Sequence, residues 1–259
     1  DDLILRKLNL QREDKNLHEW EQVVVKTLQA PAKQVKISVV GKYITLQDAY
    51  KSIYEALVHG GIANNAGVVI NKVDSEDIEK HGAEKFLKDS GGILIPGGFG
   101  FRGIEGKIAA VKFARENNIP FFGICLGMQV AAIEFARNVC GLAKANSTEF
   151  NKKTPHPVIS LLEEQRKIKD MGATMRLGRY SCKLKKATKS IKAYKKEKIS
   201  ERHRHRYEFN NAYKERMAKH GLIFSGINPE TNLVEIIELP ATERGGSVKH
   251  GGGKEHPWF

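Results

Sequence analysis

Between residues 35 and 145, short apolar runs alternate with segments whose apolar residues repeat at helical spacing. The runs are rich in β-branched residues and end in glycine or a turn, as buried strands do; they are VKISVVG, AGVVINKV, GGILIPGG and IPFFGICLG. Helix-periodic segments follow, among them EDIEKHGAEKFLKD, GIEGKIAAVKFARENN and MQVAAIEFARNV. Because strands that alternate with helices form parallel sheets covered on both faces, we expect a doubly wound α/β domain with a mostly parallel sheet.

The pattern differs at both ends of the sequence. The segment NLHEWEQVVVKTLQ predicts a helix that Pro31 ends. Within the alternating region, LQDAYKSIYEALVHGG follows VKISVVG and predicts a helix that stops at Gly60 and Gly61. After residue 145 the alternation weakens, and the one further clear strand is NLVEIIELP. Residues 241–255, ATERGGSVKHGGGKE, have the glycine content of a flexible loop or insertion. We therefore expect a helical segment over residues 1–33 and the α/β domain over residues 34–259.

Composition limits the class of protein. With 259 residues of which 41% are hydrophobic, the chain can bury a sizeable core. No run approaches the roughly 18 apolar residues of a membrane span, and the first residues are charged, so we expect a soluble cytoplasmic protein. The three cysteines are widely spaced and form no C-x-x-C pair, which argues against a disulfide framework and a zinc site.

The net charge of +13 raises the question of an acidic partner. Eight lysines and one glutamate fall within residues 183–198, KLKKATKSIKAYKKEK, and Tyr194 is the only aromatic residue among them. A solvated surface segment is the first interpretation of such a run, and contact with phosphate or with a membrane surface are the alternatives.

Cys125 lies where a predicted strand turns into a predicted helix. G-I-C-L-G has the spacing of a nucleophile elbow, in which Gly123 and Gly127 prevent collisions in a tight turn. We expect the N-terminal end of the following helix to lower the pKa of the thiol, and the N–H of Leu126 to serve as an oxyanion donor. The alternative is a buried structural cysteine, which is what we expect of Cys140 and Cys182.

A second glycine loop, IPGGFGFRGIEG at residues 95–106, follows another predicted parallel strand. Ligands of open α/β sheets bind at the carboxyl ends of the strands. Gly97 and Gly98 let the backbone approach a reacting carbonyl and supply the second oxyanion donor. The loop contains neither G-x-G-x-x-G nor a G-K-[ST] ending, so it does not predict a dinucleotide site or a P-loop.

Several motifs together resemble the glutamine amidotransferase domain of the CTP synthase family, a class I (triad) amidotransferase; they are PGGFGFRGIEGK, GICLGMQVA, NSTEF, MGATMRLG, ERHRHRYEFN and VEIIELP. The resemblance implies a flavodoxin-like sheet and a glutaminase. It also implies that ammonia passes to a synthetase domain that aminates UTP to CTP with ATP, while GTP stimulates the glutaminase step. Residues 1–33 resemble the helical linker that follows that synthetase domain.

The resemblance assigns roles to individual residues. Cys125 would be the nucleophile that forms a γ-glutamyl thioester. The residues that would bind glutamine are Gly98, Phe99, Leu126, Gln129, Glu149, Arg206 and Tyr207, with Glu149 suited to the α-ammonium and Arg206 to the α-carboxylate. Arg102, Gly103 and Glu105 would belong to a lid loop that responds to GTP.

On a strand, the segment RHRHR at residues 202–206 would place its arginines on one face and its histidines on the other. From this alternation alone, a solvated edge and an anion site are equally open, and the resemblance favours Arg206 at the glutamine pocket. We expect His203 and His205 to be structural or interfacial, and we expect no metal site.

The catalytic base and its partner come, in this family, from a His-Pro-Glu motif on the strand that follows HPWF. The sequence ends at HPWF, and its His256 precedes Pro-Trp, so it resembles the upstream element. We therefore expect the chain as given to be inactive or impaired.

The resemblance also implies partners. They are L-glutamine and the synthetase domain within a homotetramer, with no cofactor in this domain, no nucleic acid and no membrane; the full enzyme would use ATP, Mg, UTP and GTP. Two other functions are alternatives to a CTP synthase glutaminase. One is another cysteine hydrolase, such as a γ-glutamyl hydrolase, and the other is a non-catalytic nucleotide-binding or regulatory module.

Overall fold

The computed structural model describes residues 2–11, 16–161 and 175–240. These residues group into two compact units. The smaller unit combines the residues before position 36 with residues 52–69, and the larger combines residues 36–51 with those from position 70 onward. The site lies in the larger unit.

Helices make up most of the smaller unit. They are α1 (Asp2–Lys7), the π-helical turn η1 (Trp20–Val25), α2 (Lys26–Gln29) and α3 (Lys51–Ala63), which a 3-10 turn, η2 (Gln47–Tyr50), precedes. The predicted end before Pro31 is confirmed. The predicted stop at Gly60 and Gly61 is wrong, because α3 continues through both glycines. Gly61 serves packing instead: a Cβ there would lie 2.5 Å from the carbonyl oxygen of Ala66, where the chain folds back on the helix.

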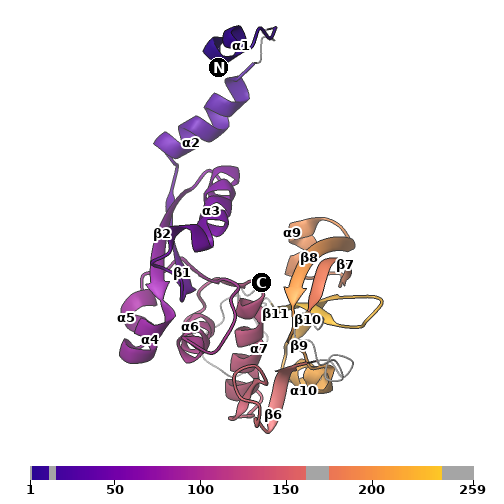
Figure 1. Cartoon of the computed structure of the whole chain (residues 1–259). Coiled ribbons are helices and arrows are strands. Elements are labelled where there is room, and N and C mark those ends of the chain that lie inside the picture. The colour runs from indigo at the N-terminus through magenta and orange to yellow at the C-terminus, as the bar shows by residue number, and fades with distance from the viewer. Residues whose placement is uncertain (1, 12–15, 162–174, 241–259) are drawn as a thin grey trace. The chain divides into compact units, whose positions relative to one another are not determined.

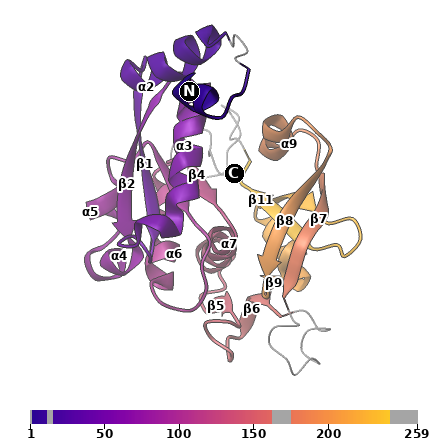
Figure 2. The ribbon, with the colours of Figure 1, turned by 45° about the horizontal axis from the view of Figure 1, so that its top comes forward.

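A parallel sheet positions the site; Figure 1 labels its strands β1 and β2, and Figure 2 also labels β4. The strand order is β2-β1-β3-β4. The bounds are β1 (Gln34–Gly41), β2 (Gly67–Asp74), β3 (Gly92–Ile95) and β4 (Phe121–Gly123). Strand β3 pairs in parallel with β1 and with β4, which confirms the predicted parallel sheet. Because Ile95 is in register with Gly123, the loops that follow β3 and β4 begin side by side.

The helices that follow these strands are α4 (Ser75–His81), α5 (Glu84–Leu87), α6 (Ile104–Glu116) and α7 (Leu126–Asn138). The predicted positions of α6 and α7 are confirmed. The single helix predicted over residues 76–89 is two helices, because Gly82 has a φ of +84° and ends α4. Ten of the 13 residues of α7 are buried. This helix lies between the parallel sheet and a second sheet (Figures 1 and 2).

The second sheet is antiparallel, with the order β11-β10-β7-β8. Its strands are β7 (Arg176–Leu184), β8 (Lys198–His205), β10 (Ile223–Ile227) and β11 (Val234–Glu238). Helix α9 (Lys189–Tyr194) connects β7 to β8. Sequence patterning predicted only β11. The lysine-rich run covers the end of β7, α9 and the start of β8, and its exposed lysines confirm a solvated surface: Lys183, Lys185, Lys186, Lys192, Lys195, Lys196 and Lys198.

A small third sheet has the order β5-β6-β9. After β9 the chain forms a 3-10 turn, η4, and a short helix, α10. The bounds are β5 (Ala145–Ser147), β6 (His156–Ser160), β9 (Glu208–Phe209), the 3-10 turn η4 (Asn211–Tyr213) and α10 (Lys214–Lys219). Cys140 and Cys182 are buried, as predicted. None of the helices in the described ranges combines the length and the apolar character needed to cross a bilayer.

Candidate active site

Cys125 occupies the turn between β4 and α7 in a backbone conformation that residues other than glycine rarely adopt. Its φ is 55° and its ψ is −105°. A Cβ on Gly123 would lie 2.5 Å from the backbone carbon of Gly127, and a Cβ on Gly127 would overlap the carbonyl oxygen of Ile95. Only glycine fits either position, so the structure contains the predicted elbow and holds the thiol at the carboxyl edge of the parallel sheet.

Two backbone N–H groups converge on the sulfur of Cys125. One belongs to Leu126 at the start of α7, and the other to Gly98 in the loop that follows β3. A Cβ on Gly97 would lie 3.7 Å from the sulfur, an ordinary van der Waals distance, so the glycine loop runs directly beside the thiol. Donors from two loops at one sulfur form the geometry that stabilises an oxyanion on a carbonyl attacked by that sulfur.

The environment of the thiol raises its pKa. Burial is the largest cause, the nearby Glu208 and Glu149 add to it, and the hydrogen bonds from Leu126 and Gly98 act in the opposite direction. The N–H of Leu126 at the helix end does act to lower the pKa, as expected, but desolvation outweighs it, so the pKa of Cys125 is raised overall rather than lowered. A thiol with a raised pKa is protonated at neutral pH and needs a base to become a nucleophile.

A cavity of about 270 Å³ opens beside the thiol. The structure brings six of the seven predicted glutamine-binding residues to its wall together with Cys125, namely Gly98, Phe99, Gln129, Glu149, Arg206 and Tyr207. The seventh, Leu126, takes part through its backbone N–H. Sequence analysis did not predict three further lining residues, Met175, Arg204 and His205.

The cavity wall carries groups of both charges. Glu149 accepts a hydrogen bond from the N–H of Gly100 at 2.7 Å through Oε1, and a carboxylate can accept further donors. Gln129 donates through Nε2 to the carbonyl of Tyr207 at 2.8 Å, which holds the segment after β8 against α7. A carboxylate and the Arg206 guanidinium beside one thiol suit an amino acid zwitterion whose side chain reaches the sulfur.

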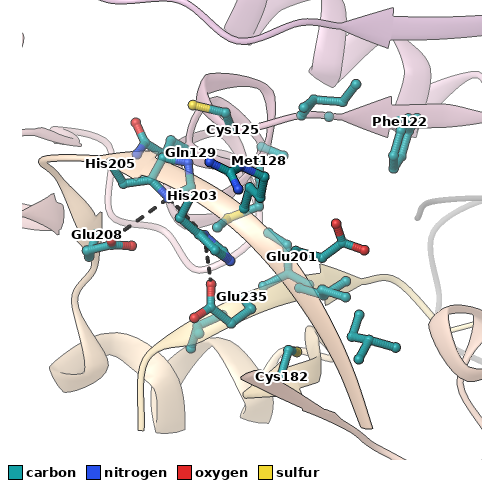
Figure 3. A pocket seen from close by; sticks show the side chains of 18 of the residues that line it. Phe122, Cys125, Met128, Gln129, Cys182, Glu201, His203, His205, Glu208 and Glu235 are labelled. Carbon is teal, nitrogen blue, oxygen red and sulfur yellow. Dashed lines mark hydrogen bonds and ion pairs between the residues drawn. The ribbon is translucent and has the colours of Figure 1, made fainter. Parts of the chain in front are cut away.

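A second cavity, of about 260 Å³, shares Cys125, Gln129 and His205 with the first. Figure 3 shows His203 and His205 on β8 beside Glu235 and Glu208. The Nδ1 of His203 lies 3.4 Å from Glu235, and the Nδ1 of His205 lies 3.9 Å from Glu208. Both histidines point inward while Arg202 and Arg204 are exposed, as the predicted alternation requires.

Arg176, at the start of β7, bonds the carboxylates of both Glu208 and Glu235. Its Nε lies 2.9 Å from Glu208, and its two terminal nitrogens bond both oxygens of Glu235, at 2.7 and 2.9 Å. Burial lowers the pKa of His205 to about 4, and the positive charges of His203 and Arg176 act in the same direction. His205 is therefore neutral at pH 7 and a weak base, although it lies at the wall of both cavities.

The three predicted lid residues do not line either cavity. Arg102 forms an ion pair with Glu76 at 3.1 Å, and Glu105 forms one with Arg137 at 2.7 Å. Gly103 has a φ of +68° at the start of α6, where a Cβ would overlap the hydroxyl of Ser75. This segment is held against α4 and α7 beside the glycine loop.

Sequence analysis missed Lys42, which directly follows β1 and contacts the glycine loop. Its position in the sequence could have indicated it, because it follows a predicted parallel strand. It therefore lies at the same carboxyl edge of the sheet as the two glycine loops. Within the described ranges, no three His, Cys, Asp or Glu side chains are placed to hold a metal ion. The predicted insertion at residues 241–255 and His256 lie outside the described residues.

Comparisons with known proteins agree with this geometry. The family model "Glutamine amidotransferase class-I" matches residues 45–243. The chain is 53% identical over its full length to the CTP synthase of Trichlorobacter lovleyi, covering 46% of it, and 55% identical over 91% of its length to that of Rippkaea orientalis, covering 43%. The chain thus spans less than half the length of these curated relatives.

Among solved structures, the glutaminase domain of Trypanosoma brucei CTPS with bound acivicin is similar, with a TM-score of 0.73 and 43% identity. The likeness covers 79% of this chain and 81% of that one.

Proposed function

Since this chain belongs to the class I glutamine amidotransferases, we propose that it hydrolyses L-glutamine through a thioester on Cys125. The observation that carries the proposal is the convergence of the Gly98 and Leu126 N–H groups on the Cys125 sulfur, at the wall of a cavity that also holds Glu149 and Arg206. This arrangement combines a nucleophile, an oxyanion site and a clamp for an amino acid zwitterion.

The reaction follows from the positions of these groups. Glu149 would bind the α-ammonium and Arg206 the α-carboxylate, so that the side-chain amide reaches the sulfur. The sulfur attacks the amide carbon, and the oxyanion forms at the N–H groups of Gly98 and Leu126. The carbon–nitrogen bond breaks, the nitrogen takes a proton and leaves as ammonia, and water then hydrolyses the thioester to glutamate.

The base that takes the proton of the raised-pKa thiol is a separate part of the proposal. The lowered pKa of His205 makes it unsuited to this role. We propose that a His-Pro-Glu motif, which the 259 residues do not contain, supplies the base and its orienting carboxylate in the complete native protein.

We further propose that the ammonia serves CTP synthesis. The relatives named CTP synthase share 50–55% identity with the chain over nearly its whole length, which supports this assignment. In such an enzyme a synthetase domain would use ATP, Mg and UTP in a cytoplasmic tetramer, and GTP would act through the segment of Arg102, Gly103 and Glu105.

The test is ammonia release from glutamine by the complete native protein, compared with its Cys125→Ser variant. We expect release by the native protein alone, with the variant folded and inactive. Equal release by both would exclude Cys125 as the nucleophile, and the absence of release with UTP, ATP and GTP present would contradict a glutaminase.

A further inference from the structure

A buried lysine lies beneath the loop that carries the Gly98 N–H. Lys42 follows β1 and is only 7% exposed. Its ammonium donates a hydrogen bond to the carbonyl of Phe99. A Cβ on Gly98 would lie 3.8 Å from the Cε of Lys42, and a Cβ on Gly100 would lie 3.8 Å from its Nζ. The lysine thus bonds Phe99 and lies beside Gly98 and Gly100 of this loop.

The peptide between Phe99 and Gly100 is bonded at both ends by opposite charges. Its carbonyl accepts from the Lys42 ammonium, and its N–H donates to the Glu149 carboxylate at 2.7 Å. Both bonds are charge-assisted, and both match the direction of the peptide dipole. The reversed peptide would point its carbonyl at the carboxylate and its N–H at the ammonium, so the two side chains select one orientation.

The loop needs this restraint from outside because its glycine-rich sequence restricts its backbone only weakly. Three of the four residues from Gly97 to Gly100 are glycines, and Gly100 has a φ of +77°. Glycine adopts many backbone conformations, so hydrogen bonds rather than side-chain packing hold this loop. The Gly98 N–H that meets the sulfur is only two residues from the clamped peptide.

Lys42 is itself held in place. Its N–H donates to the hydroxyl of Tyr50 at 3.3 Å, and its carbonyl accepts from Arg102 at 3.3 Å. Its ammonium lies 5.1 Å from the centre of the Tyr43 ring. A buried ammonium is costly unless it is bonded, so a simple packing role would be better served by an apolar side chain.

We propose that Lys42 is a positioning residue of the amidotransferase reaction: by holding the Phe99 carbonyl, it keeps the Gly98 N–H directed at the oxyanion of the tetrahedral adduct between Cys125 and the glutamine amide. This role rests on the proposed glutaminase function. It differs from that of Glu149, the other end of the clamp, because Lys42 does not line the glutamine cavity.

The experiment compares Lys42→Met and Lys42→Arg in the complete native protein, with the exposed Lys80→Met on α4 as the matched control. Two rates are measured for each variant, the turnover of glutamine and the alkylation of Cys125 by iodoacetamide. Alkylation displaces iodide without placing charge on a carbonyl oxygen, so it needs no oxyanion donor.

We expect Lys42→Met to lower kcat by about tenfold to hundredfold, since loss of an oxyanion donor costs about 100-fold or more. Its KM and its limiting alkylation rate at high pH, where Cys125 is fully ionised whatever the effect of the Gly98 N–H on its pKa, should change by about threefold or less, because Lys42 does not line the glutamine cavity. Lys42→Arg, which keeps the charge, should have a kcat between those of the native protein and Lys42→Met. Lys80→Met should match the native protein.

Two results would overturn the role of Lys42: a native kcat in Lys42→Met, or parallel losses of kcat and alkylation, which indicate general disruption. If Lys42→Met does not fold, Lys42→Arg decides: a lower kcat with unchanged KM and alkylation supports the role, and parallel losses of kcat and alkylation contradict it. If the native protein shows no glutaminase activity, both the proposed function and the role of Lys42 are excluded. If the native protein is active and Lys42→Met is equally active, only the role of Lys42 is excluded.

Discussion

At the scale of single residues, the thiol of Cys125 depends on its neighbours for reactivity. Its backbone is strained, and burial raises its pKa, so neither the fold nor the helix end makes it a thiolate at neutral pH. In the proposed reaction, the N–H groups of Gly98 and Leu126 would stabilise charge on the substrate oxygen only once attack has begun. The sulfur therefore needs a base that removes its proton, in addition to the donors that stabilise the oxyanion formed by its attack.

The raised pKa predicts slow alkylation of Cys125 at neutral pH. Only the thiolate reacts, so the rate with iodoacetamide should rise with pH and reach half its maximum above the pKa of an ordinary thiol. Mass spectrometry of the peptide that contains Cys125 follows the reaction at each pH, and Cys125→Ser provides the blank. A midpoint below pH 7 would mean that the site stabilises the thiolate.

Arg206 is expected to contribute to glutamine affinity. Arg206→Ala should weaken binding by about 1.5–3 kcal/mol, the usual range for a hydrogen bond to a charged group, or about ten- to hundredfold in Kd. Titration calorimetry with Cys125→Ser as the background avoids turnover. Arg179→Ala, which removes an exposed arginine of β7, is the control. Unchanged affinity in Arg206→Ala would place the α-carboxylate elsewhere.

At the scale of elements, the turn between β4 and α7 requires glycine on both sides of the nucleophile. Gly127→Ala is predicted to displace the elbow, because its methyl group would overlap the carbonyl oxygen of Ile95 in β3. We expect a loss of stability of about 1–3 kcal/mol, as for overpacking, together with a fall in kcat. Thermal melts and ammonia release measure the two effects.

Gly60→Ala is the matched control for this prediction. Gly60 lies in α3 with open space around its missing Cβ, so alanine should raise stability by up to about 1 kcal/mol and leave turnover unchanged. If Gly127→Ala is as stable and active as the native protein, the close packing of the elbow against β3 does not control the site.

The parallel half of the fold could be predicted from the sequence, whereas the antiparallel half could not. Strand β3 is an apolar run buried throughout, and β1, β2 and β4 are mostly apolar, as strands of a parallel sheet are. Strand β7 instead alternates, with Cys182 and Leu184 buried and the intervening Lys183 exposed, so its charged residues hide the strand in a lysine-rich sequence. Contacts between distant segments, such as Arg176 with Glu235, leave no local pattern.

The same distinction applies to the candidate site. The thiol and both glycine loops carry a local signal, because a tight turn needs small residues at fixed spacing. Glu149 and Arg206 were assigned by family resemblance, since nothing in their local sequence indicates that they reach Cys125. The contact of Lys42 with Phe99 joins positions 57 residues apart and appears only in the folded chain.

At the scale of the whole molecule, the buried Lys107 makes stability depend on pH. It is 1% exposed, and burial first, then the charge of Lys42, lowers its pKa from 10.5 to about 8. Between these values the unfolded chain binds the proton and the folded chain does not, so this residue makes the protein more stable as pH rises from about 8 towards 10.5.

Lys107→Met removes this dependence. The free energy of unfolding of the native protein, relative to that of the variant, should increase by about 2 kcal/mol between pH 7.5 and 9.5. Urea unfolding of both proteins at the two pH values measures the change. A constant difference would show that Lys107 keeps an ordinary pKa in the folded protein.

The central claim is that the Cys125 sulfur bonds covalently to the side-chain carbon of glutamine. The most direct measurement is mass spectrometry of the complete native protein, quenched in acid during turnover of glutamine and digested. The account predicts a γ-glutamyl adduct on the peptide that contains Cys125, absent from Cys125→Ser. Turnover without an adduct in the native protein, accompanied by equal turnover in Cys125→Ser, would contradict it.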